Sequence, residues 1–206
     1  MLAVPGMVVT APKNGAEMVA LIKSGLDQDA PFSVRYPRDA TPDIVPPAGE
    51  IEPVPHGSWE ILRGAPGGRD RSAAVAILAV GTMVLPSLSA AELLQESGVM
   101  VTVVNCRYLK PHDANALAEI VRDHANILVV EEGTVVNGFG AHLAAVVSEM
   151  DASVRVIAHG VRDEFVEQAP RAKQLALLGL DARGIADRVV AAFGMESSRG
   201  THLRAV

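Results

Sequence analysis

Two arginines lie close together in the segment Arg35-Tyr36-Pro37-Arg38. They follow a run of residues typical of a strand, and open α/β sheets bind ligands beyond the carboxyl ends of their strands. Guanidinium groups bind phosphate through paired, charge-assisted hydrogen bonds. The segment therefore indicates a phosphate site. The alternative is that one arginine forms a surface ion pair while the other lines an interface.

Two acidic residues, Glu131 and Glu132, directly follow an apolar run and precede a glycine-rich segment. Carboxylates in this place could hold a cation, a ribose or the N-terminus of the next helix. Gly138 and Gly140 form only a Gly-x-Gly pair, which is weak evidence for a dinucleotide site. A structural interpretation is equally open, in which the acids cap the helix and pair with a neighbouring subunit.

A third polar segment, residues 105–113, also follows an apolar run. Cys106 near Arg107 and His112 could be an activated thiol, but no acid is placed to support it, so an inert, partly buried cysteine is favoured. The histidines show no metal-ligand spacing, and the sequence has no Gly-x-Ser-x-Gly, Walker or zinc motif. We therefore assign no catalytic, cofactor-binding or metal-binding residue from these patterns.

These polar segments need strands and helices to position them. In the first part of the chain, residues 7–10 and 31–36 are expected to be strands, with a helix over residues 16–26 capped by Asn14. Later helices are expected at residues 83–96, from the cap Asp113, at 141–150, and at 185–193 after the loop at Asp181. Later strands are expected at residues 58–63, 74–80, 99–104, 127–130 and 154–158.

Apolar strands separated by helices are typical of a mostly parallel sheet covered on both faces, so we expect an α/β fold of three layers. A hairpin over residues 58–80 would add one antiparallel edge strand. For the helix at 83–96, the apolar face is expected to comprise Leu85, Leu88, Leu93 and Leu94.

Residues 40–56 hold five prolines, which exclude a regular element and mark a linker. The segment before it, residues 1–39, is too short to bury its own core and must lean on another part. The main domain is expected over residues 57–194, and the polar tail, residues 195–206, is expected to fray.

The composition argues against several classes of partner. The net charge is −6 and no long run of Lys or Arg occurs, so binding to nucleic acid or to an anionic membrane is not expected. No apolar run approaches the roughly 18 residues that a membrane span needs. The N-terminus has no signal or transit features, and the single Cys106 fits a reducing cytoplasm.

Several of these segments resemble, in the same order, the 1-deoxy-D-xylulose-5-phosphate synthase family. Residues 7–12 and 31–38 are similar to the late pyrimidine-binding domain of that family. Four later segments are similar to its transketolase-type C-terminal domain, namely residues 79–83, 104–113, 129–140 and 177–181. The resemblance covers roughly residues 1–194, and it makes residues 1–39 the end of a pyrimidine-binding domain and residues 57–194 a transketolase C-terminal domain.

The resemblance implies condensation of pyruvate with glyceraldehyde 3-phosphate, with loss of CO2, on thiamine diphosphate and Mg²⁺ in isoprenoid precursor synthesis. It implies that Arg38 contacts the phosphate of this small substrate, with Arg35 as a weaker second contact. The family's metal–diphosphate segment and its activating glutamate belong upstream and have no counterpart here. The chain is therefore expected to be inactive alone, to need an N-terminal region or subunit, and to form a cytoplasmic homodimer.

Three positions depart from the family pattern. Asp39 stands where the family has glycine, Gly133 replaces an asparagine, and Asn137 takes the first position of a glycine pair. The alternatives are a transketolase C-terminal subunit or part of a 2-oxo-acid dehydrogenase β-subunit, and a non-catalytic dimerisation module. The Arg-Tyr-Pro-Arg segment and the Arg-Tyr-Leu-Lys-Pro segment that starts at Arg107 favour the synthase.

Overall fold

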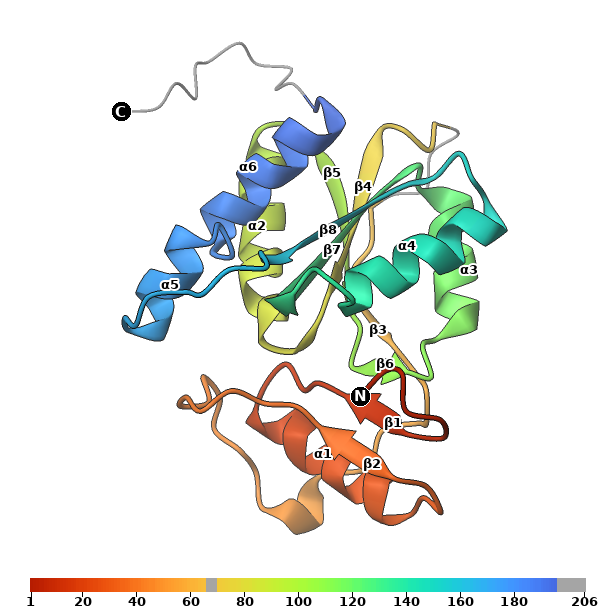
Figure 1. Ribbon diagram of the computed structural model, residues 1–206, viewed down its shortest axis with the longest axis vertical. Helices are drawn as coiled ribbons and strands as arrows, with labels where there is room; N and C mark the ends of the chain where they lie inside the picture. The colour runs from red at the N-terminus through yellow and green to blue at the C-terminus, as the bar shows by residue number, and fades with distance from the viewer. Residues whose placement is uncertain (66–69, 196–206) are drawn as a thin grey trace.

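The computed structural model describes residues 1–65 and 70–195, which form a small sheet near the N-terminus and a larger sheet flanked by helices (Figure 1). The small sheet has the order β2-β1-β6, and the larger sheet has the order β3-β5-β4-β7-β8. The strands are β1 (Val8–Thr10), β2 (Phe32–Val34), β3 (Glu60–Arg63), β4 (Ala74–Ala79), β5 (Met100–Asn105), β6 (Tyr108–Lys110), β7 (Asn126–Thr134) and β8 (Arg155–Val161).

Within the described residues, four helices lie between strands and two more follow the last strand. They are α1 (Gly15–Leu26), α2 (Val84–Glu96), α3 (Ala114–Asp123), α4 (Phe139–Met150), α5 (Arg171–Leu177) and α6 (Ala182–Phe193), with short 3₁₀ turns η1 (Ala48–Glu50) and η2 (Gly81–Met83). Asn14, Asp113 and Asp181 cap α1, α3 and α6, each side chain accepting a hydrogen bond from a backbone amide of the first turn. The predicted caps Asn14 and Asp113 are confirmed, whereas α6 begins at Ala182, three residues before its expected start, with Asp181 as its cap.

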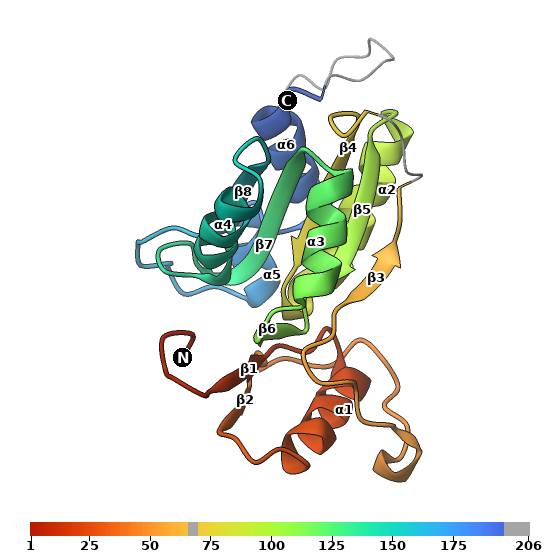
Figure 2. The ribbon, with the colours of Figure 1, turned by 90° about the vertical axis from the view of Figure 1, so that its right-hand side faces the viewer.

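The larger sheet is the middle layer of three. Its strands β4, β5, β7 and β8 run parallel, and β3 joins antiparallel at the edge. Helices α3 and α4 cover one face, and α2 and α6 cover the other (Figure 2). The predicted three-layer, mostly parallel α/β fold is therefore confirmed, together with its antiparallel edge strand.

Alternate residues of the central strands enter different cores, because successive side chains of a strand point to opposite faces. On β4, Leu78 packs in the cluster that contains α3 and α4, whereas Ile77 packs in the cluster that contains α2 and α6. On β7, Val129 and Leu128 divide in the same way. Burial on both faces explains why these strands read as continuous apolar runs.

The first part of the chain is joined to the main domain through β6. This strand follows β5 and pairs antiparallel with β1, Val9 opposite Lys110 and Thr10 opposite Tyr108. The indole Nε1 of buried Trp59 donates to the Tyr108 carbonyl oxygen at 2.7 Å. The small sheet thus contains strands from both sides of the proline-rich segment, so residues 1–39 complete their core with later residues.

The structure corrects two details. The hairpin over residues 58–80 is wrong, because both edges of β4 are taken by the parallel neighbours β5 and β7, and β3 pairs with β5 instead. The apolar face of α2 is also partly wrong, since Leu85 and Leu93 are 43% and 37% exposed. Leu94 is buried as predicted, and the rest of the buried face comprises Val84 and three small residues, Ser87, Ala90 and Ala91.

Two short elements, β6 and α5, were not predicted. Each is too short to carry a periodic pattern, and β6 exists because of its distant partner β1. None of the helices within residues 1–65 and 70–195 is long and apolar enough to cross a bilayer. The predicted tail lies outside the described residues, apart from Met195.

Candidate functional site

The Arg35-Tyr36-Pro37-Arg38 segment leaves β2 at the place where the small sheet meets the main domain. The Arg35 amide still donates to the Thr10 carbonyl oxygen at 2.8 Å, so the β1–β2 ladder continues to this residue. Beyond Arg35 the chain turns away, and Tyr36 and Pro37 lie in the wall between two cavities. Arg38 lines one cavity and Arg35 lines the other.

The larger cavity, called the arginine pocket here, has a volume of about 610 Å³. It lies between the N-terminal part and the start of α2 and α5, so both parts of the molecule contribute to its wall. Its polar lining includes Lys13, Arg38, Asp39, Thr41, Thr82 and Arg171. Arg38 is exposed and takes part in none of the ion pairs found in residues 1–65 and 70–195. Its guanidinium group is therefore available to an anion.

Lys13, the other cation from the N-terminal part, is already neutralised. Its ammonium group forms an ion pair with Glu60 and a second one with Glu17 at 3.5 Å. The carboxylate of Glu17 also accepts a hydrogen bond from Asn105 at 2.7 Å. Lys13 thus ties α1 to β3 and β5, and we do not assign it to a ligand.

Arg171, the first residue of α5, is the third cation of the arginine pocket. Its Nε donates to Glu132 Oε1 at 2.8 Å, and its Nη2 donates to Glu132 Oε2 and, at 3.0 Å, to Thr82 Oγ1. Its Nη1 donates to Asp39 Oδ2 at 3.2 Å. The hydrogen bonds to Glu132 raise the pKa of Arg171, so this side chain is firmly cationic.

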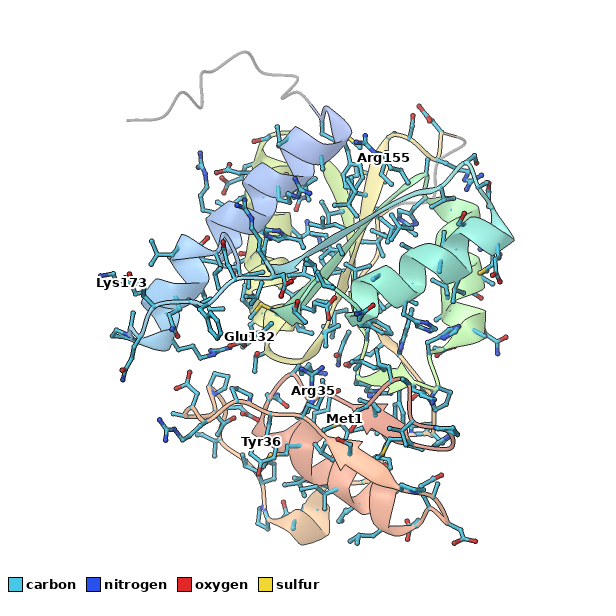
Figure 3. The ribbon with its side chains drawn as sticks, in the orientation of Figure 1. Met1, Arg35, Tyr36, Glu132, Arg155 and Lys173 are labelled. Atoms are coloured by element: carbon cyan, nitrogen blue, oxygen red, sulfur yellow. The ribbon has the colours of Figure 1, made fainter. Side chains whose placement is uncertain are left out.

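The smaller cavity, called the acidic pocket here, has a volume of about 400 Å³ and is lined by Arg35, Glu131 and Glu132. In Figure 3, Arg35 lies between the N-terminal part and the lower end of the large sheet, with Glu132 above it. The structure therefore separates the two arginines: Arg38 lines the pocket whose acidic lining residue is Asp39, and Arg35 lines the pocket that contains Glu131 and Glu132. A Cβ at position 133 would lie in ordinary contact with Arg35, 3.7 Å from its Nη2, so the space here does not require glycine.

Glu131 caps helix α4. Its carboxylate, on a side chain that is only 3% exposed, accepts hydrogen bonds from the Phe139 amide at 3.0 Å and the Gly140 amide at 2.8 Å. The approach requires glycine at 138, where a Cβ would lie 2.6 and 2.8 Å from the two carboxylate oxygens. Asn137 adopts a φ of 57°, a left-handed conformation that asparagine tolerates. The capping interpretation of Glu131 is therefore the one that the geometry supports.

The third polar segment does not form a nucleophilic site. Cys106 is fully buried, and burial raises the pKa of its thiol well above the ordinary value. Arg107 is held by the backbone oxygen of Ser58 at 3.0 Å and by its hydroxyl at 2.8 Å. The predicted inert cysteine agrees with this burial, although the side chain is more deeply buried than expected.

Neither Glu131 nor Glu132 is arranged to hold the diphosphate-bound metal of a thiamine enzyme. Glu131 is occupied by two amides and Glu132 by a guanidinium group. Within residues 1–65 and 70–195, no group of three His, Cys, Asp or Glu side chains could hold a metal ion. The carboxylates of this site are therefore engaged within the protein and offer no metal-ligand group.

Comparison with known proteins first defines the class. The family model described as "Transketolase, C-terminal domain" matches residues 68–185. A solved structure described as a split-gene transketolase in an inactive β4 tetramer superposes with a TM-score of 0.81 and 28% identity, covering 95% of this chain and 61% of that one. The main domain is thus a transketolase-type C-terminal domain.

Curated relatives with similar sequences identify the family within this class of proteins. A 1-deoxy-D-xylulose-5-phosphate synthase of Synechococcus sp. is 38% identical over 199 residues, which cover 96% of this chain and 30% of the relative. Another, of Geobacter sulfurreducens, is 40% identical over 183 residues, which cover 88% of this chain and 28% of the relative. The chain belongs to the 1-deoxy-D-xylulose-5-phosphate synthase family, as its motifs indicated, and it spans about 30% of the length of these relatives.

Sequence reasoning missed Arg171 and the role of Asp39. Residue 171 follows a proline in a polar stretch with no periodic signal, and its partners Thr82, Glu132 and Asp39 are 89, 39 and 132 positions away. The sequence did contain one signal for this ion pair. Asp39 is an acid at a position where the family has glycine, and it stands next to Arg38. Its ion pair with Arg171 gives that departure a structural reason.

Proposed function

We propose that this chain forms the C-terminal part of a 1-deoxy-D-xylulose-5-phosphate synthase, which condenses pyruvate with glyceraldehyde 3-phosphate with loss of CO2. The observation that carries the proposal is Arg38, exposed on the 610 Å³ arginine pocket between the two parts of the molecule. Family membership supplies the reaction, and the pocket supplies a place for the phosphate of the acceptor.

Arg38 would bind the phosphate through two parallel hydrogen bonds, because a guanidinium fork matches phosphate oxygens. The pocket wall from Thr82 to Leu85 would hold the remainder of the substrate against the main domain. Arg35 is a weaker candidate, since it lines the acidic pocket, where Glu131 and Glu132 disfavour an anion. Thiamine diphosphate, when bound, would supply the carbanion chemistry.

We further propose that the ligands of thiamine diphosphate and Mg²⁺ come from the part of the enzyme that this chain does not match, in the same polypeptide or a separate subunit. The relatives are about three times as long as the matched segment, which leaves room for such a part. Assembly as a homodimer and a location in the cytoplasm belong to the same proposal. The split-gene transketolase is itself described as an oligomer, which supports self-association of related chains.

The test of this function is a chimera in which the chain replaces the matching part of the Synechococcus relative. In it, Arg38→Gln is expected to raise KM for glyceraldehyde 3-phosphate about tenfold to a hundredfold, because a charge-assisted contact contributes about 1.5–3 kcal/mol. KM for pyruvate is expected to change little. Steady-state kinetics with each substrate varied in turn measure both constants.

Arg162→Gln is the matched control, because Arg162 is exposed in the loop after β8 and does not line the arginine pocket. Equal effects of the two substitutions on KM for the aldehyde would contradict the role of Arg38. A rise in KM for both substrates would point to a change of fold or assembly instead of a lost phosphate contact.

A transketolase C-terminal subunit is the second candidate, and the split-gene transketolase neighbour favours it. Such a subunit would support transfer of a two-carbon unit between sugar phosphates, without release of CO2. Assaying the chimera with a ketose phosphate donor in place of pyruvate distinguishes the two functions.

A further inference from the structure

Arg171 holds an orientation that leaves one edge of its guanidinium group facing the arginine pocket. Glu132 accepts hydrogen bonds from Nε and Nη2 of Arg171, and the Thr82 hydroxyl oxygen accepts one from Nη2. These contacts come from the end of β7 and from the turn after β4, so they fix the group to the main domain. The remaining nitrogen, Nη1, contacts only Asp39 among the hydrogen bonds of the described residues, at 3.2 Å.

The ion pair between Asp39 and Arg171 is exposed to solvent and therefore weak. Its side chain is 46% exposed, against 29% for that of Arg171, and it follows β2 in a segment without regular structure. Exposed ion pairs contribute little to stability, on the order of 0–1 kcal/mol. A ligand carrying two negative charges can therefore compete with this carboxylate for Nη1.

Arg38 and Arg171 belong to one site through Asp39. Arg38 is the chain neighbour of Asp39, and both arginines line the same cavity. Glu132 and Asp39 both form ion pairs with Arg171, so while Asp39 stays in place Arg171 offers a phosphate little net attraction and Arg38 is the arginine that attracts it. Moving Asp39 away restores one positive charge and exposes one preoriented donor.

We propose that Arg171 is a second phosphate-binding residue of the arginine pocket and that Asp39 is a built-in competitor, which an incoming phosphate displaces. The inference deepens the proposed function, since it takes phosphate as the ligand of that pocket. It gives the departure from glycine at position 39 a consequence: this chain binds phosphate more weakly than a chain without that carboxylate.

A double-mutant cycle on the purified chain tests the proposal. Inorganic phosphate is titrated at fixed low ionic strength into the unaltered chain, Asp39→Asn, Arg171→Gln and the double variant, and the dissociation constants are compared by NMR. Asp39→Asn is expected to tighten binding about threefold to tenfold, the size of one nearby charge interaction in partly exposed surroundings. Arg171→Gln is expected to weaken binding, and in its background the gain from Asp39→Asn is expected to disappear.

The matched controls are Asp163→Asn and Arg162→Gln, which change net charge equally at exposed positions outside the pocket. An Asp39→Asn gain that persists unchanged without Arg171, or that Asp163→Asn reproduces, would overturn the proposal, because the effect would then be one of general charge. The Nε–Hε resonance of Arg171 adds a local readout, which should shift on phosphate addition in the unaltered chain and more strongly in Asp39→Asn.

The two proposals fail in different ways. Loss of phosphate binding on Arg38→Gln, with no effect of Asp39→Asn, would reject the competitor and leave the phosphate pocket standing. An absence of phosphate binding by all variants would reject both. Amide spectra that match the unaltered chain outside the pocket establish that each variant is folded.

Discussion

Replacing Glu131 with alanine is expected to lower the free energy of unfolding by about 2–4 kcal/mol. The carboxylate is buried and accepts hydrogen bonds from the amides of Phe139 and Gly140 at the start of α4. A buried donor left without a partner costs about 1–3 kcal/mol, and alanine removes the partner of two donors. Urea unfolding followed by circular dichroism measures the change.

Glu149→Ala is the matched control, because Glu149 lies exposed near the end of the same helix. Glu131→Gln should fall between the two, since its amide offers one acceptor oxygen and turns a donor toward the second backbone N–H. Equal stability of Glu131→Ala and Glu149→Ala would mean that the cap contributes nothing. In that case, the loop of residues 133–138 would owe its position to other contacts.

Replacing Glu17 with alanine is expected to cost about 3–5 kcal/mol and to loosen the N-terminal part from the main domain. Glu17 is 6% exposed and lies at the junction of the two parts. It accepts hydrogen bonds from the Lys13 amide and from Asn105 Nδ2, both at 2.7 Å, and forms an ion pair with Arg107 at 3.6 Å. Its removal leaves the Lys13 amide without its acceptor and takes away the carboxylate that is ion-paired with Arg107, and breaking a buried charge pair costs about 3–5 kcal/mol.

Limited proteolysis within residues 40–56 measures the loosening, since this segment has no regular structure apart from η1. Faster cleavage is expected for Glu17→Ala than for the control Glu92→Ala, whose side chain is exposed on α2. If both variants are cleaved at the rate of the unaltered chain, the junction does not depend on this network. The result bears on function because Arg38 belongs to the N-terminal part, which this junction joins to the main domain.

Local signals predicted the parts of the fold that local chemistry decides. The caps Asn14, Asp113 and Asp181 are short-range hydrogen bonds, and each stands beside the helix that it starts. The apolar runs of β4 and β7 mark strands that are buried on both faces. Their continuous apolar sequence is therefore enough to predict them as buried strands.

Pairings between distant residues could not be predicted in this way. The partner of β3 is β5 because β4 has no free edge, and β6 is a strand because β1 lies beside it. In the site, Arg35 and Arg38 are three positions apart, yet they line different cavities because Tyr36 and Pro37 lie between them. Arg171 lines the arginine pocket from α5, and no sequence motif links it to the distant residues that form the rest of the wall.

We propose that this chain contributes a phosphate pocket to a synthase whose cofactor ligands lie elsewhere. The most direct measurement is release of labelled CO2 from pyruvate, dependent on glyceraldehyde 3-phosphate, with thiamine diphosphate and Mg²⁺ supplied. We expect no turnover by the purified chain, and turnover when it is combined with the part of the Synechococcus relative that it does not match. Turnover by the chain alone would contradict the claim, and so would an inactive complex of the two parts.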